Sequence, residues 1–63
     1  MSDDHDVIQK AYEAYLTAIY AVFTSSFTTA LGDKQKEAEA EAAFKKAVAH
    51  GRHIRDRALA LLS

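Results

Sequence analysis

The stretch Ala30-Leu31-Gly32-Asp33-Lys34 decides the fold, because it combines a signal that ends one helix with a signal that begins the next. Gly32 follows an apolar periodic segment, and glycine is the residue that most often ends a helix. Asp33 can cap the N-terminus of the segment that follows. We therefore predict helices over about residues 4–31 and 34–62, joined by a tight turn at Gly32 and Asp33.

Two helices joined by so short a connection must fold back on each other as an antiparallel pair. The chain has no Pro and only two Gly, so little else could interrupt either helix. The predicted fold class is therefore all-α: one helical-hairpin domain over residues 1–63, each helix about 40 Å long at 1.5 Å per residue.

The chain is short for a protein that folds alone. It has 63 residues, 49% hydrophobic and 27% charged, which is the composition of a folded protein. A chain of this length buries only about 60% of its unfolded surface. No Cys is present, so neither disulfides nor thiolate-bound metal can compensate. Self-association is the remaining usual remedy.

The first predicted helix is apolar around much of its circumference. One apolar stripe holds Ile8, Ala11, Tyr15, Ala18 and Val22, and a second holds Tyr12, Leu16, Ile19, Phe23, Phe27 and Ala30. Only a narrow line is polar: Gln9, Glu13, Thr17, Tyr20, Thr24 and Thr28. A helix this apolar packs against more than one neighbour, whereas a hairpin offers it only one.

The second predicted helix carries a heptad seam spaced alternately four and three residues apart: Ala40, Phe44, Ala47, Gly51, Ile54, Ala58 and Leu61. Such a seam favours antiparallel packing at a shallow crossing angle. Gly51 in the interior costs about 1 kcal/mol relative to Ala. Close approach of the facing helix is the preferred explanation for this glycine, and a kink or break at His50-Gly51 is the alternative.

Two wide apolar faces on one small hairpin predict a homodimer with twofold symmetry, in which four helices form a bundle. We expect the more aromatic first helix to lie at its centre. The predicted dimer core consists of Leu16, Ile19, Phe23, Phe27, Phe44, Ile54 and Leu61.

The charges are unevenly distributed, although the net charge is only −1. Residues 45–63 hold Lys45, Lys46, Arg52, Arg55 and Arg57 against the single acidic residue Asp56. A basic strip of this kind can bind phosphate groups or an acidic partner. It is also what the helix dipole favours, since acidic residues begin this helix and basic residues end it.

The sequence offers little for chemistry. His50 and His53 share a helix face at a spacing that suits a metal, but a complete site would need two further ligands. There is no Gly-rich phosphate loop and no Cys nucleophile, and a thin bundle has no pocket that excludes water. We expect no enzymatic activity and no cofactor.

A membrane span is not expected either. Residues 14–31 carry no formal charge, but they include six Ser or Thr and two Tyr. The acidic start of the chain is unlike a signal peptide, so a cytoplasmic location is the default expectation.

Three classes of function remain. The favoured class is a protein–protein interaction module, an adaptor, chaperone or inhibitor of a larger protein. Its partner-binding residues would be Tyr20, Arg52, His53 and Arg55, because an exposed Tyr and Arg are favoured interface anchors. The second class is a nucleic-acid-binding dimer: in length and plan the chain resembles the Rop-type RNA-binding hairpin, without a shared residue motif. A structural or membrane-surface helix pair is the third.

Overall fold

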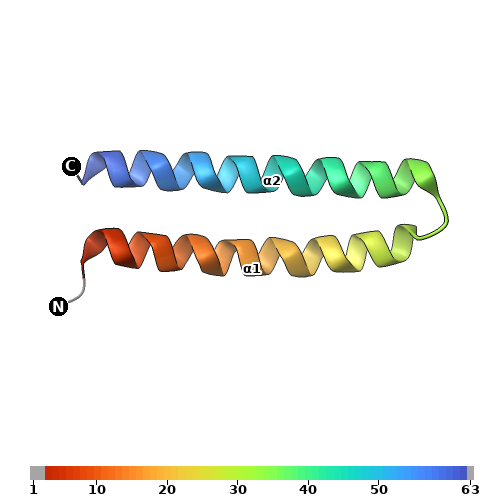
Figure 1. The fold of residues 1–63 in the computed structure, drawn as a ribbon, viewed down its shortest axis with the longest axis horizontal. Coiled ribbons are helices and arrows are strands. Elements are labelled where there is room, and N and C mark those ends of the chain that lie inside the picture. Colours follow the sequence, from red (N-terminus) through yellow and green to blue (C-terminus); the bar gives the residue numbers. More distant parts are fainter. Residues whose placement is uncertain (1–2, 63) are drawn as a thin grey trace.

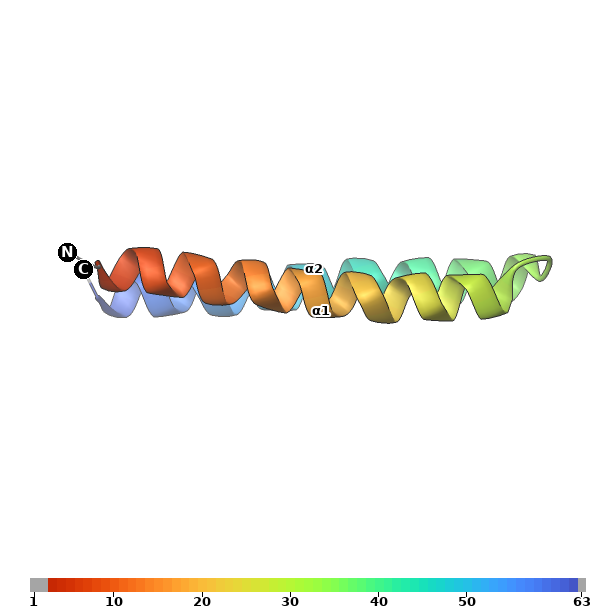
Figure 2. The ribbon, with the colours of Figure 1, turned by 90° about the horizontal axis from the view of Figure 1, so that it is seen from below.

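The computed structural model describes residues 3–62, which form two helices, α1 over Asp4–Ala30 and α2 over Lys34–Leu61. The helices run antiparallel and side by side along their whole length (Figure 1). Viewed along the plane of the pair, they cross at a shallow angle (Figure 2). The predicted all-helical hairpin is therefore confirmed, and α1 ends one residue earlier than expected.

The connection is a type II β-turn. Leu31 has φ −54° and ψ 129°, Gly32 has φ +93°, and the Asp33 amide donates to the Ala30 carbonyl at 2.9 Å. The second central position of this turn requires positive φ, which glycine adopts without strain. The turn therefore needs a glycine at this position.

The second helix begins at once because Asp33 caps it. Its carboxylate accepts hydrogen bonds from the amides of Gln35 and Lys36, at 3.1 and 3.2 Å. Glu37 reaches back and accepts from the Gly32 amide at 3.1 Å, which satisfies another amide at the helix start. These bonds fix where α2 starts and how it leaves the turn.

Asp3 caps α1 in the same way. Its carboxylate accepts from the His5 amide at 3.1 Å, and His5 Nδ1 lies 3.1 Å from the same oxygen. The backbone hydrogen bond, followed by the side-chain bond, lowers the pKa of Asp3 below its ordinary value. By residue type Ser2, Asp3 and Asp4 can each cap a helix. The structure uses Asp3, Asp4 is the first residue of the helix, and Ser2 lies outside the described residues.

At Gly51 the ring of Tyr15 on α1 packs directly against the backbone of α2. The helix α2 continues unbroken through this glycine, so the alternative of a kink or break is wrong. Gly51 is buried, and a Cβ built on it would lie 2.7 Å from Cδ1 of Tyr15. The absent side chain is therefore the space that the Tyr15 ring occupies.

Two other contacts join the helices. The Phe23 ring lies 4.6 Å from the Phe44 ring and 5.5 Å from the Phe27 ring, measured between centroids. Nearer the chain ends, the guanidinium of Arg55 lies over the ring of Tyr12, 4.5 Å from its centroid. The helices are thus joined by aromatic side chains along most of their length.

At the C-terminal end of the heptad seam, α1 leaves Ile54 and Leu61 largely uncovered. Their exposed fractions are 53% and 79%. A straight helix rotates by about 20° per heptad relative to a strict seven-residue repeat. Arg55 lies over Tyr12 of α1, while Ile54 lies at the border of the groove between the helices.

Little of the hairpin is buried. Among residues 3–62 only Ala30, at 5% exposure, and Gly51 are buried, and no large side chain is fully enclosed. The Cα atoms extend 48 × 19 × 7 Å, a single layer of helix. The radius of gyration is 14.8 Å, whereas a compact chain of this length has about 10.6 Å.

Candidate functional site: two faces of the helix pair

A single layer of two helices has two broad faces, and they differ. We define the groove face by two apolar grooves between α1 and α2, of about 290 and 250 Å³. The first groove is lined by Ile8, Ala11, Tyr12, Tyr15, Gly51, Ile54, Arg55 and Ala58. The second is lined by Ile19, Val22, Phe23, Ser26, Ala40, Ala43, Phe44 and Ala47.

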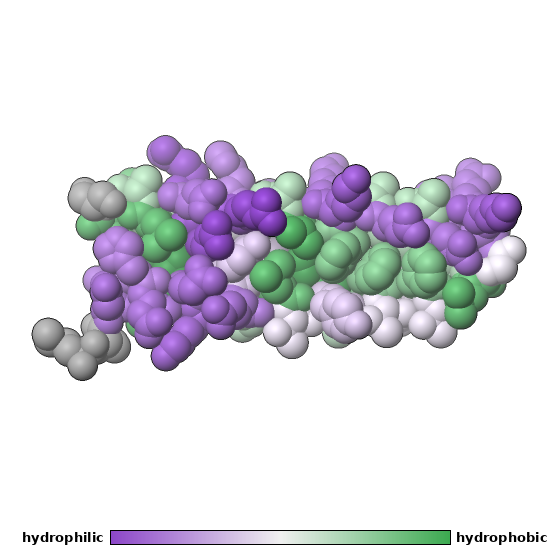
Figure 3. Space-filling view, viewed as in Figure 1, coloured by the Kyte–Doolittle hydropathy of each residue, from purple (hydrophilic) through white to green (hydrophobic). Residues whose placement is uncertain are grey.

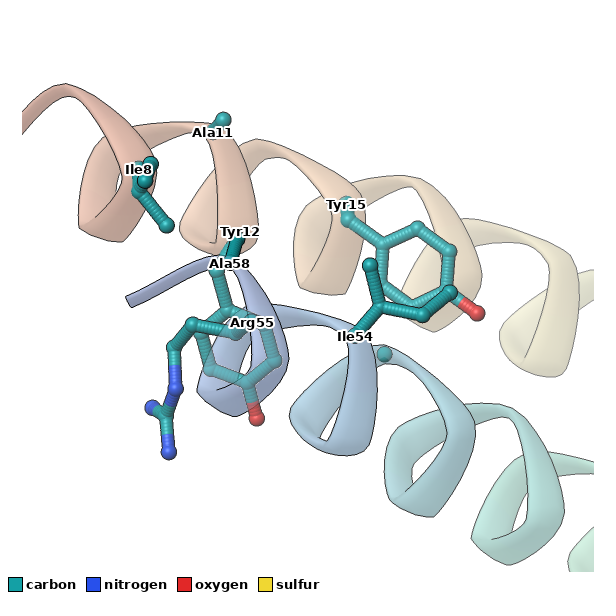
Figure 4. Close-up of a pocket in the computed structure, with 8 residues that line it drawn as sticks. Ile8, Ala11, Tyr12, Tyr15, Ile54, Arg55 and Ala58 are labelled. Carbon is teal, nitrogen blue, oxygen red and sulfur yellow. The ribbon is translucent and has the colours of Figure 1, made fainter. Parts of the chain in front are cut away.

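Helical spacing places both grooves on the same side of the pair. Val22 continues the line of Ala11 and Tyr15 along α1, since residues three or four apart share a face. Ala47 and Ala43 continue the line of Ile54 along α2 in the same way. Figure 4 views the first groove with α1 above α2, so it shows the side turned away in Figures 1 and 3.

The groove face is hollow because its side chains are small. Alanines and Gly51 make up much of the lining on α2, and Ala11 contributes from α1. Two larger apolar residues stand out beside the hollows, Ile54 at the first groove and Val22, 65% exposed, at the second. In Figure 4, Ile8 and Ile54 enter the groove from opposite helices. The face thus combines protruding apolar side chains with apolar hollows.

Tyr15 holds the two helices together beneath this face. Its hydroxyl donates to the carbonyl of Ala47 at 3.0 Å, while its ring lies against Gly51. In an α-helix the Ala47 carbonyl also accepts the backbone hydrogen bond from the Gly51 amide, four residues later. Tyr15 belongs to an apolar stripe of the sequence, and its residue type alone does not predict this bond, although Gly51 was a signal that a large side chain would pack there.

The opposite face, turned to the viewer in Figure 3, is more varied. It has a hydrophilic area near the chain ends and a hydrophobic band that continues toward the turn. Helical spacing puts Leu16 and Phe27 on this side of α1, both of them half-buried. These two side chains are bulkier than the alanines that line the groove face on α2.

Two threonines of the polar line of α1 use their hydroxyls within the helix. Thr17 and Thr24 donate to the carbonyls of Glu13 and Tyr20, four residues earlier, at 3.0 and 2.9 Å, and Thr29, beside the line, donates to Ser25 in the same way at 3.0 Å. These bonds satisfy the hydroxyls within the helix. The line is therefore less polar than its residue types suggest.

The four residues predicted to bind a partner do not form one cluster. Tyr20 is 63% exposed, and Arg52 and His53 are exposed as well. Arg55 is half-buried: its Nε and Nη2 donate to the Asp56 carboxylate at 3.1 and 2.9 Å. Tyr20 is on α1, about six residues, or about 9 Å along the helix axis, from the point of α1 that lies opposite Arg52.

The predicted dimer core divides between the two faces. Leu16, Ile19, Phe23, Phe27 and Phe44 are half-buried within the hairpin, while Ile54 and Leu61 are exposed. Ile54 borders the first groove, and Ile19, Phe23 and Phe44 line the second. Leu16 and Phe27 line neither groove.

No metal centre is assembled in the described part of the chain. Residues 3–62 contain no group of three or more His, Asp or Glu side chains placed to hold an ion. In the same range, neither helix carries an apolar run of the length needed to cross a bilayer.

The chain has no significant match among protein-family models, curated proteins or solved structures.

Proposed function

We propose that this chain is a non-enzymatic protein–protein interaction module that works as a homodimeric four-helix bundle, an adaptor, chaperone or inhibitor of a larger protein. The observation that carries the proposal is the exposure of apolar surface. Val7, Val22, Ile54 and Leu61 are each more than half exposed. Large exposed apolar patches on a small protein mark interaction sites.

The amount of exposed surface supports a second copy. The accessible area of the chain is 4945 Å², whereas a folded monomer of its 6.9 kDa exposes about 4,000 Å². The excess of about 900 Å² matches the roughly 800 Å² that each partner buries in a standard interface. One interface of ordinary size would thus bring the chain to the exposure of a normal folded protein.

The charges favour a protein partner over nucleic acid. Arg55, the central residue of the basic segment, already contacts the Asp56 carboxylate and the Tyr12 ring. The net charge of −1 supplies no general attraction to phosphate. A nucleic-acid complex would lose affinity steeply with salt, and that outcome would favour the Rop-like alternative.

Two measurements test the proposal. Sedimentation equilibrium of the purified chain should give the mass of a dimer at micromolar concentration. A tagged chain should then capture one stoichiometric protein from the cells that make it, and Tyr20→Ala or Arg52→Glu should weaken that capture at least tenfold.

Matched controls separate the partner surface from general damage. Leu31 has the same exposed fraction as Tyr20, 63%, but it lies in the turn and is not part of the proposed partner surface. Leu31→Ala should therefore leave capture unchanged. Lys34→Glu reverses an exposed charge away from the proposed surface and should also have no effect. A monomeric chain, or capture that survives both Tyr20→Ala and Arg52→Glu, would contradict the proposal.

A further inference from the structure

We infer that the groove face binds the second copy in one particular arrangement, with α1 against α1 and α2 against α2, antiparallel, and with the two turns at opposite ends. The inference rests on the proposed dimer and adds to it which face is used and in which orientation. It leaves the opposite face, with Arg52, uncovered in both copies.

The two grooves repeat one pattern of lining positions. On α1 each groove uses residues i, i+3, i+4 and i+7, starting at Ile8 in the first groove and Ile19 in the second. On α2 the same spacing starts at Gly51 and Ala40. Both pairs of starting residues are eleven positions apart. A twofold axis level with Thr17 therefore places the first groove of one copy over the second groove of the other.

The protruding side chains fit this arrangement. Ile54 stands beside the first groove and faces the second groove of the other copy, which is lined by Ala40, Ala43 and Ala47. Val22 faces the α1 side of the other copy's first groove, near Ala11. Each copy would thus insert two exposed apolar side chains into hollows lined by small residues, as knobs fit holes between packed helices.

Charges at the edge of the face select this orientation. Glu39 and Arg57 directly precede the groove residues Ala40 and Ala58, and they lie 18 residues apart, which is about five full turns. Neither forms an ion pair with any residue from 3 to 62. The point midway between Glu39 and Arg57 is within one residue of the point on α2 midway between the two grooves. The twofold axis therefore sets Glu39 of each copy beside Arg57 of the other.

The competing orientation, with both turns at the same end, lacks this match. It lays α2 of one copy on α1 of the other. Because Arg55 lies over Tyr12, Arg57 is level with Lys10 and would meet Lys10 of the second copy. Lys10 is paired with Asp6 at 3.2 Å, so in this orientation Arg57 would meet a lysine whose nearest acid is already in an ion pair.

Cysteine cross-linking tests the axis, since the chain contains no Cys of its own. Ala18 lies on the groove face next to the proposed axis, so Ala18→Cys should form a disulfide-linked dimer under mild oxidation. Ala11→Cys is the matched control on the same stripe, because its two copies would be about 20 Å apart along the axis. Failure of Ala18→Cys to cross-link in a dimer, or equal cross-linking of Ala11→Cys, would overturn the arrangement.

A charge swap tests the orientation without altering the apolar surface. Arg57→Glu and Glu39→Arg should each raise the dimer Kd about tenfold, because two symmetric ion pairs become repulsive. The double variant should return the Kd to within about threefold of the original. If Arg57→Glu leaves the Kd unchanged or lowers it, the orientation is wrong while the proposed dimer stands. If the unmodified chain is monomeric, the proposed function itself fails.

Discussion

The helices of this chain meet in two different ways at two places. In the half nearer the turn, Phe23 packs on Phe44 and Phe27, so the contact consists of bulky rings. In the half nearer the chain ends, Tyr15 lies against Gly51 and bonds to the Ala47 carbonyl, so the contact depends on a missing side chain. The first contact depends on apolar volume and the second on shape, and substitutions should separate them.

The largest effect is expected where the rings meet. Phe23→Asp should leave the chain largely unfolded, because an unpaired carboxylate among aromatic rings costs several kcal/mol against a small total stability. Circular dichroism should show the loss of helix.

Phe23→Leu is the matched control for this substitution. It keeps the site apolar and close in volume, and it should cost only about 1 kcal/mol in urea denaturation. Helicity in Phe23→Asp equal to that of the unmodified chain would show that the ring cluster does not hold the helices together.

The next effect is expected at the glycine. Gly51→Val should destabilise the fold by about 2 kcal/mol, because the new side chain overlaps the Tyr15 ring. Ala49→Val introduces the same residue on an exposed position of α2 and should cost only about 0.5 kcal/mol. Urea denaturation measures both.

A double variant shows whether the overlap is the cause. In a chain that already carries Tyr15→Ala, Gly51→Val should lower the free energy of unfolding much less than it does in the unmodified chain, since the ring is no longer present. Equal costs for Gly51→Val and Ala49→Val would refute the shape argument.

A smaller effect isolates one hydrogen bond of the second contact. Tyr15→Phe keeps the ring against Gly51 but removes the donor to the Ala47 carbonyl, so it should cost about 1 kcal/mol. Tyr20→Phe removes a hydroxyl from an exposed ring and should cost almost nothing. The bond would be without consequence for stability if the two variants had the same thermal midpoint.

The smallest effect concerns the N-terminus of α1, which lies beyond both contacts between the helices. The pKa of Asp3 is lowered in the folded chain by its hydrogen bonds to His5, so this stabilisation is fully present above the ordinary carboxyl pKa. It is lost as the pH falls through the lowered pKa. Asp3→Asn should flatten this part of the stability–pH curve between about pH 5 and 2. An unchanged acid limb would contradict the assignment.

Features set by local chemistry could be predicted from the sequence. Gly32 and Asp33 act through their own backbone and the next turn of helix, so the hairpin, its helices and its caps follow from residue types. Gly51 also signalled a close approach, because an interior helix glycine needs a reason. These predictions depended on no long-range register.

Features that depend on the register between the helices could not be predicted. The exposure of Ile54 and the packing of Arg55 on Tyr12 depend on small rotations that accumulate over several turns. The Tyr15 bond to Ala47 joins residues 32 positions apart, and its geometry exists only once the helices are aligned. The position of both grooves on one side of the helix pair has the same origin.

The dependence of the thermal midpoint on protein concentration tests the central claim most directly. If a second copy completes the core, folding and association are coupled, and the midpoint should rise by about 5 °C for each tenfold increase in concentration. A cooperative transition whose midpoint does not change across the micromolar range would show that the hairpin is stable alone, and would contradict the account.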